Sequence, residues 1–169
     1  MVLRNLPLHH MKMTIQTIGK LGAEVSRDHY DVKIKMNRSP QAISYLCTAP
    51  YPGFPTDLQS PLLAILCTAK DSSCIEERVF ENRFLTVEEL RKMGANVCVI
   101  GQTAHITPVE YLRGTVVNAR DLRGGAALVL AGLGAKGTTI IENAEVIFRG
   151  YEDISKDFRC LGANIRTLS

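Results

Sequence analysis

Apolar residues recur along this chain at two spacings, which predict amphipathic helices and half-buried strands. Near the start, apolar residues stand three or four positions apart, at Leu8, Met11, Ile15 and Ile18. This spacing places their side chains on one face of a helix, which Gly22 is expected to end. Further on, apolar and polar residues alternate, with the apolar ones at Tyr30, Val32, Ile34 and Met36. This alternation is typical of a strand with one buried face.

Two later segments predict amphipathic helices of the same kind. Thr86 with Glu89 has the pattern of a capping box, and Leu85 with Leu90 is spaced for a hydrophobic staple across it. A second segment has apolar residues at helical spacing, at Tyr151, Ile154, Phe158 and Leu161. Each segment runs into a Gly-Ala pair, and glycine is the residue at which helices commonly end.

Two other segments predict helices that are apolar on all sides. Between Asp57 and Lys70, and again between Arg123 and Lys136, the chain has no charged residue. The second segment consists of Ala, Leu, Gly and Val alone. Because a helix that is apolar all round is buried all round, we expect these two helices at the centre of the domain. The sheet and the amphipathic helices would surround them.

The Gly-Ala pairs mark an internal repeat. They lie in three similar words, Lys-Leu-Gly-Ala-Glu-Val, Lys-Met-Gly-Ala-Asn-Val and Cys-Leu-Gly-Ala-Asn-Ile, whose glycines are Gly22, Gly94 and Gly162. These glycines are 72 and 68 positions apart. An Asp-Leu pair also opens each apolar segment, at Asp57 and at Asp121. A fixed period of this length is typical of a domain made of similar structural units.

The repeat sets the expected domain organisation. We predict a single α/β domain over 1–169, with a partial repeat at 1–50 and further repeats at 51–115 and 116–169. The partial repeat lacks the opening apolar helix of the others, so the sequence predicts a truncated or split protein. Loss of that helix would leave a groove lined by Leu and Ala, from which we expect self-association or reduced stability.

Composition narrows the class of protein. The 169 residues are 46% hydrophobic, contain no Trp and carry a net charge of +3. This fraction of hydrophobic residues is enough to form one core, and the net charge is too small to indicate a nucleic-acid-binding surface. No apolar run reaches the roughly 18 residues of a membrane-spanning helix, and no signal-peptide pattern opens the sequence, so we expect a soluble cytoplasmic protein. Five cysteines without a Cys-x-x-Cys pair indicate reduced thiols, most of them expected to be buried.

Two motifs have a plain structural explanation. Gly132, Gly134 and Gly137 match the G-x-G-x-x-G fingerprint of dinucleotide sites. They end a predicted helix and precede the predicted strand 138–142, whereas that fingerprint must follow a strand and open a helix. No metal-binding pair such as His-x-His or His-Glu-x-x-His occurs among the four histidines, His9, His10, His29 and His105. We therefore expect neither a nucleotide cofactor nor a metal at these residues.

Charged residues at the starts of the two apolar helices are the best candidates for a functional site. Asp57 and Asp121 each stand where a helix begins, and each alone is explained as an N-cap. The strands after these helices return to the same end of the domain, which would bring Arg83 and Arg149 to the aspartates, beside Arg123. Three guanidinium groups and two helix N-termini would bind a phosphate or carboxylate. A structural salt-bridge network would use the same residues.

Four longer words surround these charged residues. They are Tyr-Pro-Gly-Phe-Pro-Thr-Asp-Leu-Gln at 51–59, Val-Phe-Glu-Asn-Arg-Phe at 79–84, Asp-Leu-Arg at 121–123 and Arg-Gly-Tyr-Glu at 149–152. In order and spacing they resemble the C-terminal half of the UDP-N-acetylglucosamine 1-carboxyvinyltransferases, members of the EPSP synthase-like superfamily. The resemblance implies an inside-out α/β barrel domain of βαβαββ repeats, with helices inside, sheets outside, and substrates between two such domains.

The resemblance also implies an activity and roles for residues. The family transfers the enolpyruvyl group of phosphoenolpyruvate to the 3-hydroxyl of UDP-N-acetylglucosamine, in peptidoglycan synthesis, without a metal or organic cofactor. Asp57 would contact that hydroxyl as the candidate base, and Asp121 would lie near the reacting carbons. Val79 would bind UDP-N-acetylglucosamine through its backbone. The residues that would bind phosphoenolpyruvate are Arg83, Arg123 and Arg149.

Two departures from the family pattern bear on this expectation. The family's catalytic Cys loop, its Lys-Asn pair and its uridine-binding segment belong to the N-terminal half, and none of the five cysteines here matches. We therefore expect the isolated chain to be inactive and to need that half as a partner. Phe148 stands where the family commonly has Asp, which removes a possible partner of Arg149. A catalytically inactive homologue, a binding module, and the shikimate-pathway enolpyruvyl transferase remain as alternatives, and the last fits these words less well.

Overall fold

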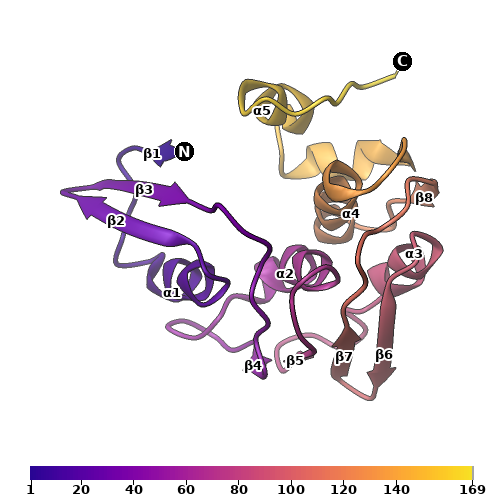
Figure 1. Ribbon diagram of the computed structural model, residues 1–169, viewed down its shortest axis with the longest axis horizontal. Helices are drawn as coiled ribbons and strands as arrows, with labels where there is room; N and C mark the ends of the chain where they lie inside the picture. Colours follow the sequence, from indigo (N-terminus) through magenta and orange to yellow (C-terminus); the bar gives the residue numbers. More distant parts are fainter. Residues whose placement is uncertain (169) are drawn as a thin grey trace.

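The first part of the chain forms a three-stranded antiparallel sheet (Figure 1). The computed structural model describes residues 1–168. The strands follow the spatial order β1-β3-β2, with bounds β1 (Val2–Leu3), β2 (Glu24–Asp28) and β3 (Asp31–Lys35). Helix α1 (Lys12–Lys20) connects β1 to β2, and Gly22 follows it with a φ of 95°. Glycine adopts this left-handed conformation without a steric penalty, which is why the helix ends there.

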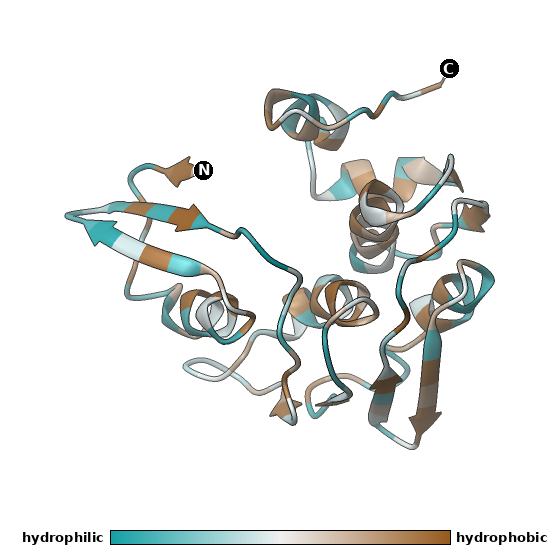
Figure 2. Ribbon diagram, viewed as in Figure 1, coloured by the Kyte–Doolittle hydropathy of each residue, from teal (hydrophilic) through white to brown (hydrophobic). Residues whose placement is uncertain are grey.

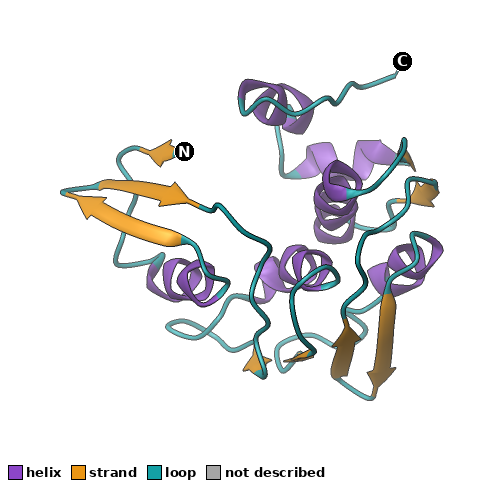
Figure 3. Ribbon diagram, in the orientation of Figure 1, coloured by secondary structure: helices purple, strands orange, loops and turns teal. Residues whose placement is uncertain are grey.

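The middle of the chain forms a four-stranded sheet in the order β4-β5-β7-β6. The β4–β5 pair is parallel, and the other two pairs are antiparallel. The strands are β4 (Leu46–Cys47), β5 (Ser73–Glu76), β6 (Asn96–Ile100) and β7 (Thr103–Thr107). The connections are the 3-10 helix η1 (Thr56–Leu58) with helix α2 (Gln59–Leu66), and then helix α3 (Thr86–Lys92). In Figure 3 this sheet and the first sheet lie on different sides of α2.

The last part of the chain has one pair of parallel strands and more helix. Helix α4 (Leu122–Gly134) connects β8 (Val116–Asn118) to β9 (Ile140–Glu142). The 3-10 helix η2 (Ala144–Arg149) and helix α5 (Ile154–Cys160) follow. Because α4 ends at Gly134 and β9 begins at Ile140, the glycine-rich segment ends a helix, as its position in the sequence indicated.

Helices α2 and α4 pack against each other and carry much of the core. Every residue of α2 except Ile65 is buried, and α4 is buried over 124–129 and at Ala131. Figure 2 shows this concentration of apolar residues on the two helices. The prediction of two buried helices is thus confirmed for α2 and for most of α4. None of the helices within 1–168 combines the length and apolar character needed to span a bilayer.

Small residues in α4 permit close packing. A Cβ on Gly125 would lie 2.5 Å from Cγ1 of Ile147 in η2, well inside the normal contact distance between carbon atoms. Ile147 is only 2% exposed and belongs to a smaller core cluster with Ala126, Val129 and Ile154. Glycine at position 125 therefore allows η2 to lie directly against α4.

Four local predictions are wrong. Helix α3 has no capping box, because the helical conformation starts at the N-cap Leu85 and Thr86 is already the first helical residue. Leu85 is also 46% exposed, so the staple with Leu90 does not form. Most of the cysteines are not buried, contrary to expectation. Cys67 is buried, Cys47 and Cys74 are half-buried, and Cys98 and Cys160 are exposed. Cys98 lies on the outward side of β6, and Cys160 lies at the exposed end of α5. The helices at both termini are also shorter than predicted, since Leu8 and Tyr151 precede them.

Candidate functional site

Asp57 and Arg123 meet at one end of the α2–α4 pair. The Asp57 carboxylate, in η1, accepts a hydrogen bond from Nε of Arg123 in the first turn of α4, and the two form an ion pair. This contact places the N-terminal ends of α2 and α4 side by side. The Asp57 side chain is 59% exposed and that of Arg123 is 36% exposed, so solvent and small ligands can reach both. The hydrogen bond to Asp57 raises the pKa of the Arg123 guanidinium further, and this group stays charged.

The two aspartates have different local roles. Asp121 is the N-cap of α4, and its Oδ1 accepts hydrogen bonds from the backbone N–H groups of Arg123 and Gly124, both at 2.9 Å. The N-cap explanation is confirmed for Asp121. It is wrong for Asp57, because neither η1 nor α2 has a side-chain cap and the Asp57 carboxylate bonds to Arg123 instead. A charged guanidinium is a stronger hydrogen-bond partner than a backbone N–H.

Arg83 and Arg149 lie in segments that pack against the first turn of α4, and neither is hydrogen-bonded to Asp57 or Asp121 within residues 1–168. Arg83 lies in the turn before α3, with its Cζ 4.5 Å from the ring centroid of Phe80. The hydroxyl oxygen of Thr86, which follows that turn, lies against Gly124 of α4. Arg149 ends η2, and a Cβ on the next residue, Gly150, would lie 2.8 Å from Cδ2 of Leu122, the first residue of α4.

Neither of these two arginines has an acidic partner within 1–168. The residue before Arg149 is Phe148, whose side chain is 42% exposed. Among the three candidate arginines, only Arg123 has a carboxylate partner within residues 1–168. Helix N-termini add positive potential at the start of α4.

A buried glutamate connects the loop of Val79 to η1. Glu77 is 1% exposed, and its carboxylate accepts hydrogen bonds from four groups: Oγ1 of Thr48 at 2.8 Å, Oγ1 of Thr56 at 2.9 Å, and the N–H groups of Val79 at 2.8 Å and Phe80 at 3.0 Å. Glu77 is not among the site residues predicted from the sequence. A signal was present, because the alternation of β5 places position 77 on the same side as the buried Ser73 and Ile75.

A second buried carboxylate connects α3 to the approach of α4. Glu89, also 1% exposed, accepts hydrogen bonds from Nζ of Lys92 at 2.7 Å, the N–H of Asn118 at 3.0 Å and Nη2 of Arg120 at 3.4 Å. Burial raises the pKa of Glu89, but the hydrogen bonds from Lys92 and Asn118 and the nearby positive charges bring it below its ordinary value. This residue was expected to cap α3, and it instead stabilises the segment that leads to Asp121.

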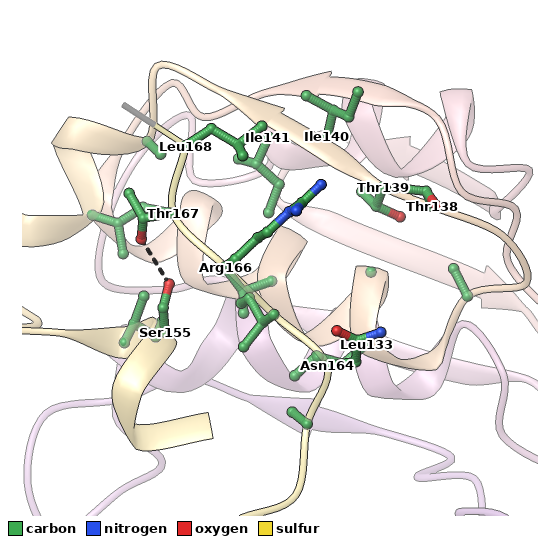
Figure 4. Close-up of a pocket in the computed structure, with 18 of the residues that line it drawn as sticks. Leu133, Thr138, Thr139, Ile140, Ile141, Ser155, Asn164, Arg166, Thr167 and Leu168 are labelled. Atoms are coloured by element: carbon green, nitrogen blue, oxygen red, sulfur yellow. Dashed lines mark hydrogen bonds between the residues drawn. The ribbon is translucent and has the colours of Figure 1, made fainter. Parts of the chain in front are cut away.

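One cavity of the molecule lies away from the candidate site. It has a volume of about 980 Å³ and lies between α4, β9, η2, α5 and the segment 162–168 (Figure 4). In Figure 4 the side chain of Arg166 extends towards β9, and Ser155 is joined to Thr167 by a hydrogen bond of 3.0 Å. Of the candidate residues, none lines this cavity. Over the part of the chain that the structure describes, no three or more His, Cys, Asp or Glu side chains are grouped to hold a metal ion.

Comparison with known proteins gives a family match over nearly the whole chain. The family model described as EPSP synthase (3-phosphoshikimate 1-carboxyvinyltransferase) matches residues 1–158. A Clostridium perfringens (strain 13 / Type A) protein named UDP-N-acetylglucosamine 1-carboxyvinyltransferase 1 is 48% identical in an alignment 159 residues long, which covers 92% of this chain and 38% of that protein. A Desulfofundulus thermocisternus protein named UDP-N-acetylglucosamine 1-carboxyvinyltransferase is 43% identical over 164 residues, which are 97% of this chain and 67% of that protein.

A solved structure is similar over the same region. The crystal structure of the enolpyruvyl transferase NikO from Streptomyces tendae superposes with a TM-score of 0.82 and 27% sequence identity, and the match covers 94% of this chain and 37% of that one. The chain also spans only 37% of a Caldanaerobacter subterraneus relative and 38% of a Kosmotoga olearia relative, both named UDP-N-acetylglucosamine 1-carboxyvinyltransferase. These matches therefore concern one part of longer proteins.

Proposed function

The chain belongs to the EPSP synthase family of enolpyruvyl transferases, and we propose that it forms part of a UDP-N-acetylglucosamine 1-carboxyvinyltransferase. The proposed reaction transfers the enolpyruvyl group of phosphoenolpyruvate to the 3-hydroxyl of UDP-N-acetylglucosamine, in cytoplasmic peptidoglycan synthesis. The names of relatives at 42–48% identity support the choice of substrate. The observation that carries the proposal is the Asp57–Arg123 pair at the adjoining N-terminal ends of α2 and α4.

The chemistry assigns a role to each group at this end. In the addition step the sugar hydroxyl attacks C2 of phosphoenolpyruvate, its proton leaves to Asp57, and a proton is added at C3. Elimination then removes a proton from C3 and releases phosphate, which restores the double bond in the product. The phosphate and carboxylate groups need cations, and the proposed ones are Arg83, Arg123 and Arg149.

Two further residues complete the proposed binding site within this chain. Asp121 caps α4 through Oδ1, and its Oδ2 would lie near the reacting carbons. The N–H of Val79 is taken by Glu77, so the Val79 carbonyl is the backbone group proposed to bind the amino sugar. Neither metal nor organic cofactor has a role in these steps.

The domain architecture is proposed in the same way. We infer three similar units at 1–50, 51–115 and 116–169, arranged as an inside-out α/β barrel. The elements from β4 to β7 follow the order β-α-β-α-β-β, which supports a unit of this kind but starts it at β4 (Leu46–Cys47), ahead of position 51. Gly22, Gly94 and Gly162 also have nearly equal φ values of 95°, 90° and 91° after α1, α3 and α5.

The proposed partner is the N-terminal half of the enzyme, since the relatives named above are longer than the matched region. That half would supply the acid that protonates C3 and would close over the substrates. On this proposal the isolated chain is inactive. Self-association is the other proposed behaviour, and sedimentation over a range of protein concentrations measures it.

The test is phosphate release from phosphoenolpyruvate and UDP-N-acetylglucosamine. We expect no release by the chain alone, release when a separately expressed N-terminal half of a relative is added, and loss of that release with Asp57→Ala. Shikimate 3-phosphate in place of the amino sugar should give no phosphate, which separates the two family activities. If the mixture released no phosphate over a wide concentration range but still bound substrate, the result would favour a catalytically inactive homologue or a binding module.

A further inference from the structure

We propose that Glu77 is a positioning residue that holds the segment of Asp57 and the loop of Val79 in register for the amino-sugar substrate. The proposal rests on the function proposed above. Glu77 does not itself touch the substrate, because its carboxylate is buried and occupied by protein groups. Its effect would pass through the neighbours of the two substrate-binding residues.

The hydrogen bonds of Glu77 account for both of its oxygens. Oε1 accepts from the Thr48 hydroxyl and from the N–H groups of Val79 and Phe80, and Oε2 accepts from the Thr56 hydroxyl. No Lys or Arg is among these partners, and Glu77 forms no ion pair within the described 168 residues. A carboxylate is costly to bury unless hydrogen bonds compensate it. A side chain needed only to fill space would not have to carry a charge.

The four donors come from segments that the fold must hold together. Thr56 immediately precedes Asp57 and begins η1. Val79 and Phe80 lie in the loop after β5, and Thr48 follows β4. One carboxylate therefore fixes the position of the proposed base relative to the proposed sugar-binding backbone, across 22 positions of sequence from Asp57 to Val79.

The Glu77→Gln substitution keeps the shape and changes the bonding. An amide has one acceptor oxygen, and its NH2 group cannot accept from a hydroxyl or an N–H. The Gln oxygen can keep the three donors of Oε1 while its NH2 donates to the Thr56 hydroxyl, but all of these hydrogen bonds lose the negative charge that makes a carboxylate bond about twice as strong. Since misplacement by about 1 Å costs on the order of 100-fold in rate, this weaker hold on the two segments should be visible in turnover.

The first measurement is amide hydrogen exchange on the chain itself, which needs no activity. We expect Glu77→Gln to speed exchange at Val79 and Phe80 at least about tenfold while exchange in α2 and α4 changes little. Thr56→Val removes only the bond beside Asp57, and Thr56→Ser should restore it. Ser73→Ala is the control, because Ser73 is also buried, begins the strand that leads to Glu77, and accepts one hydrogen bond, from the N–H of Ile43 at 3.1 Å.

The second measurement uses the enzyme reconstituted with its N-terminal half. We expect Glu77→Gln and Thr56→Val to raise KM for UDP-N-acetylglucosamine and to lower kcat by about 10- to 100-fold, with KM for phosphoenolpyruvate changed less than about twofold. Equal changes in both KM values, or the same profile from Ser73→Ala, would reduce Glu77 to a stability role and overturn the proposal. So would unchanged exchange at Val79 and Phe80. If the wild-type mixture released no phosphate, only the proposed function would be rejected. Hydrogen exchange would still test whether Glu77 links the two segments.

Discussion

The carboxylate of Asp57 is bonded to Nε of Arg123, a residue 66 positions later in the sequence. The pair joins η1 to the first turn of α4 and leaves both side chains partly exposed. A structural ion pair at this exposure contributes little to stability. The proposed function gives the pair a further role, in a reaction that removes a proton and releases an anion.

The first prediction concerns this pair. Asp57→Asn keeps the size of the side chain and removes its ability to accept a proton, so phosphate release by the reconstituted enzyme should fall by about 10²- to 10⁴-fold. The free energy of unfolding should change by less than about 1 kcal/mol, because the pair is exposed. Phosphate assays and thermal melts on the same samples measure both. Near-normal turnover by Asp57→Asn would remove Asp57 from the role of base.

The second prediction concerns the packing of α4. Gly125→Ala would place a Cβ 2.5 Å from Ile147, and the resulting overpacking should destabilise the protein by about 1–3 kcal/mol. Gly134→Ala is the matched control, because a Cβ there meets nothing within 4 Å. It should be neutral or stabilise the helix end by up to about 1 kcal/mol. Urea unfolding of the two variants provides the comparison, and an equal loss in both would contradict the close α4–η2 contact.

The sequence predicted the elements better than their ends. The apolar helices were recognisable because the absence of charge over a dozen residues leaves no solvent-facing side for a helix. The start of α3 was misplaced because the backbone becomes helical at Leu85, one residue before the threonine that was expected to cap it. A local capping motif does not indicate which polar groups the fold brings close to a side chain. In the folded protein Glu89 accepts hydrogen bonds from Asn118, Lys92 and Arg120, and it does not cap α3.

The candidate site was predicted only in part, because its side-chain contacts also depend on residues that are distant in sequence. The repeat correctly indicated that Asp57 and Arg123 come together, since both stand at the starts of similar helices. Spacing alone could not show that Arg83 stacks on Phe80 and bonds to neither aspartate. Glu77 was overlooked because a charged residue at the end of a strand is usually exposed. Its burial depends on donors from Thr48 and Thr56, which are distant in sequence.

The third prediction concerns the cysteines. Burial raises the pKa of the Cys67 thiol to about 12, so little thiolate forms at mildly alkaline pH and reagents cannot reach it. Cys98 and Cys160 are exposed, and iodoacetamide should modify them first in the folded protein. Mass mapping of peptides before and after urea unfolding would follow each thiol. Early labelling of Cys67 in native buffer would mean that α2 opens locally.

The last prediction concerns stability in acid. The pKa of Glu89 in the folded protein lies below its ordinary value of 4.5, so the charged form stabilises the fold. This contribution is complete above the ordinary pKa and is lost as the pH falls through the lower, folded value. Glu89→Gln should therefore cost about 1–3 kcal/mol near neutral pH.

The difference between wild type and Glu89→Gln should shrink as the pH falls below about 4.5, and urea unfolding at neutral and acidic pH measures it. Glu88→Gln is the control, because the Glu88 side chain is 59% exposed where it pairs with Arg120, and its effect should stay below about 1 kcal/mol. If the Glu89→Gln difference were the same at both pH values, the stabilisation by Glu89 would come from packing and not from its charge.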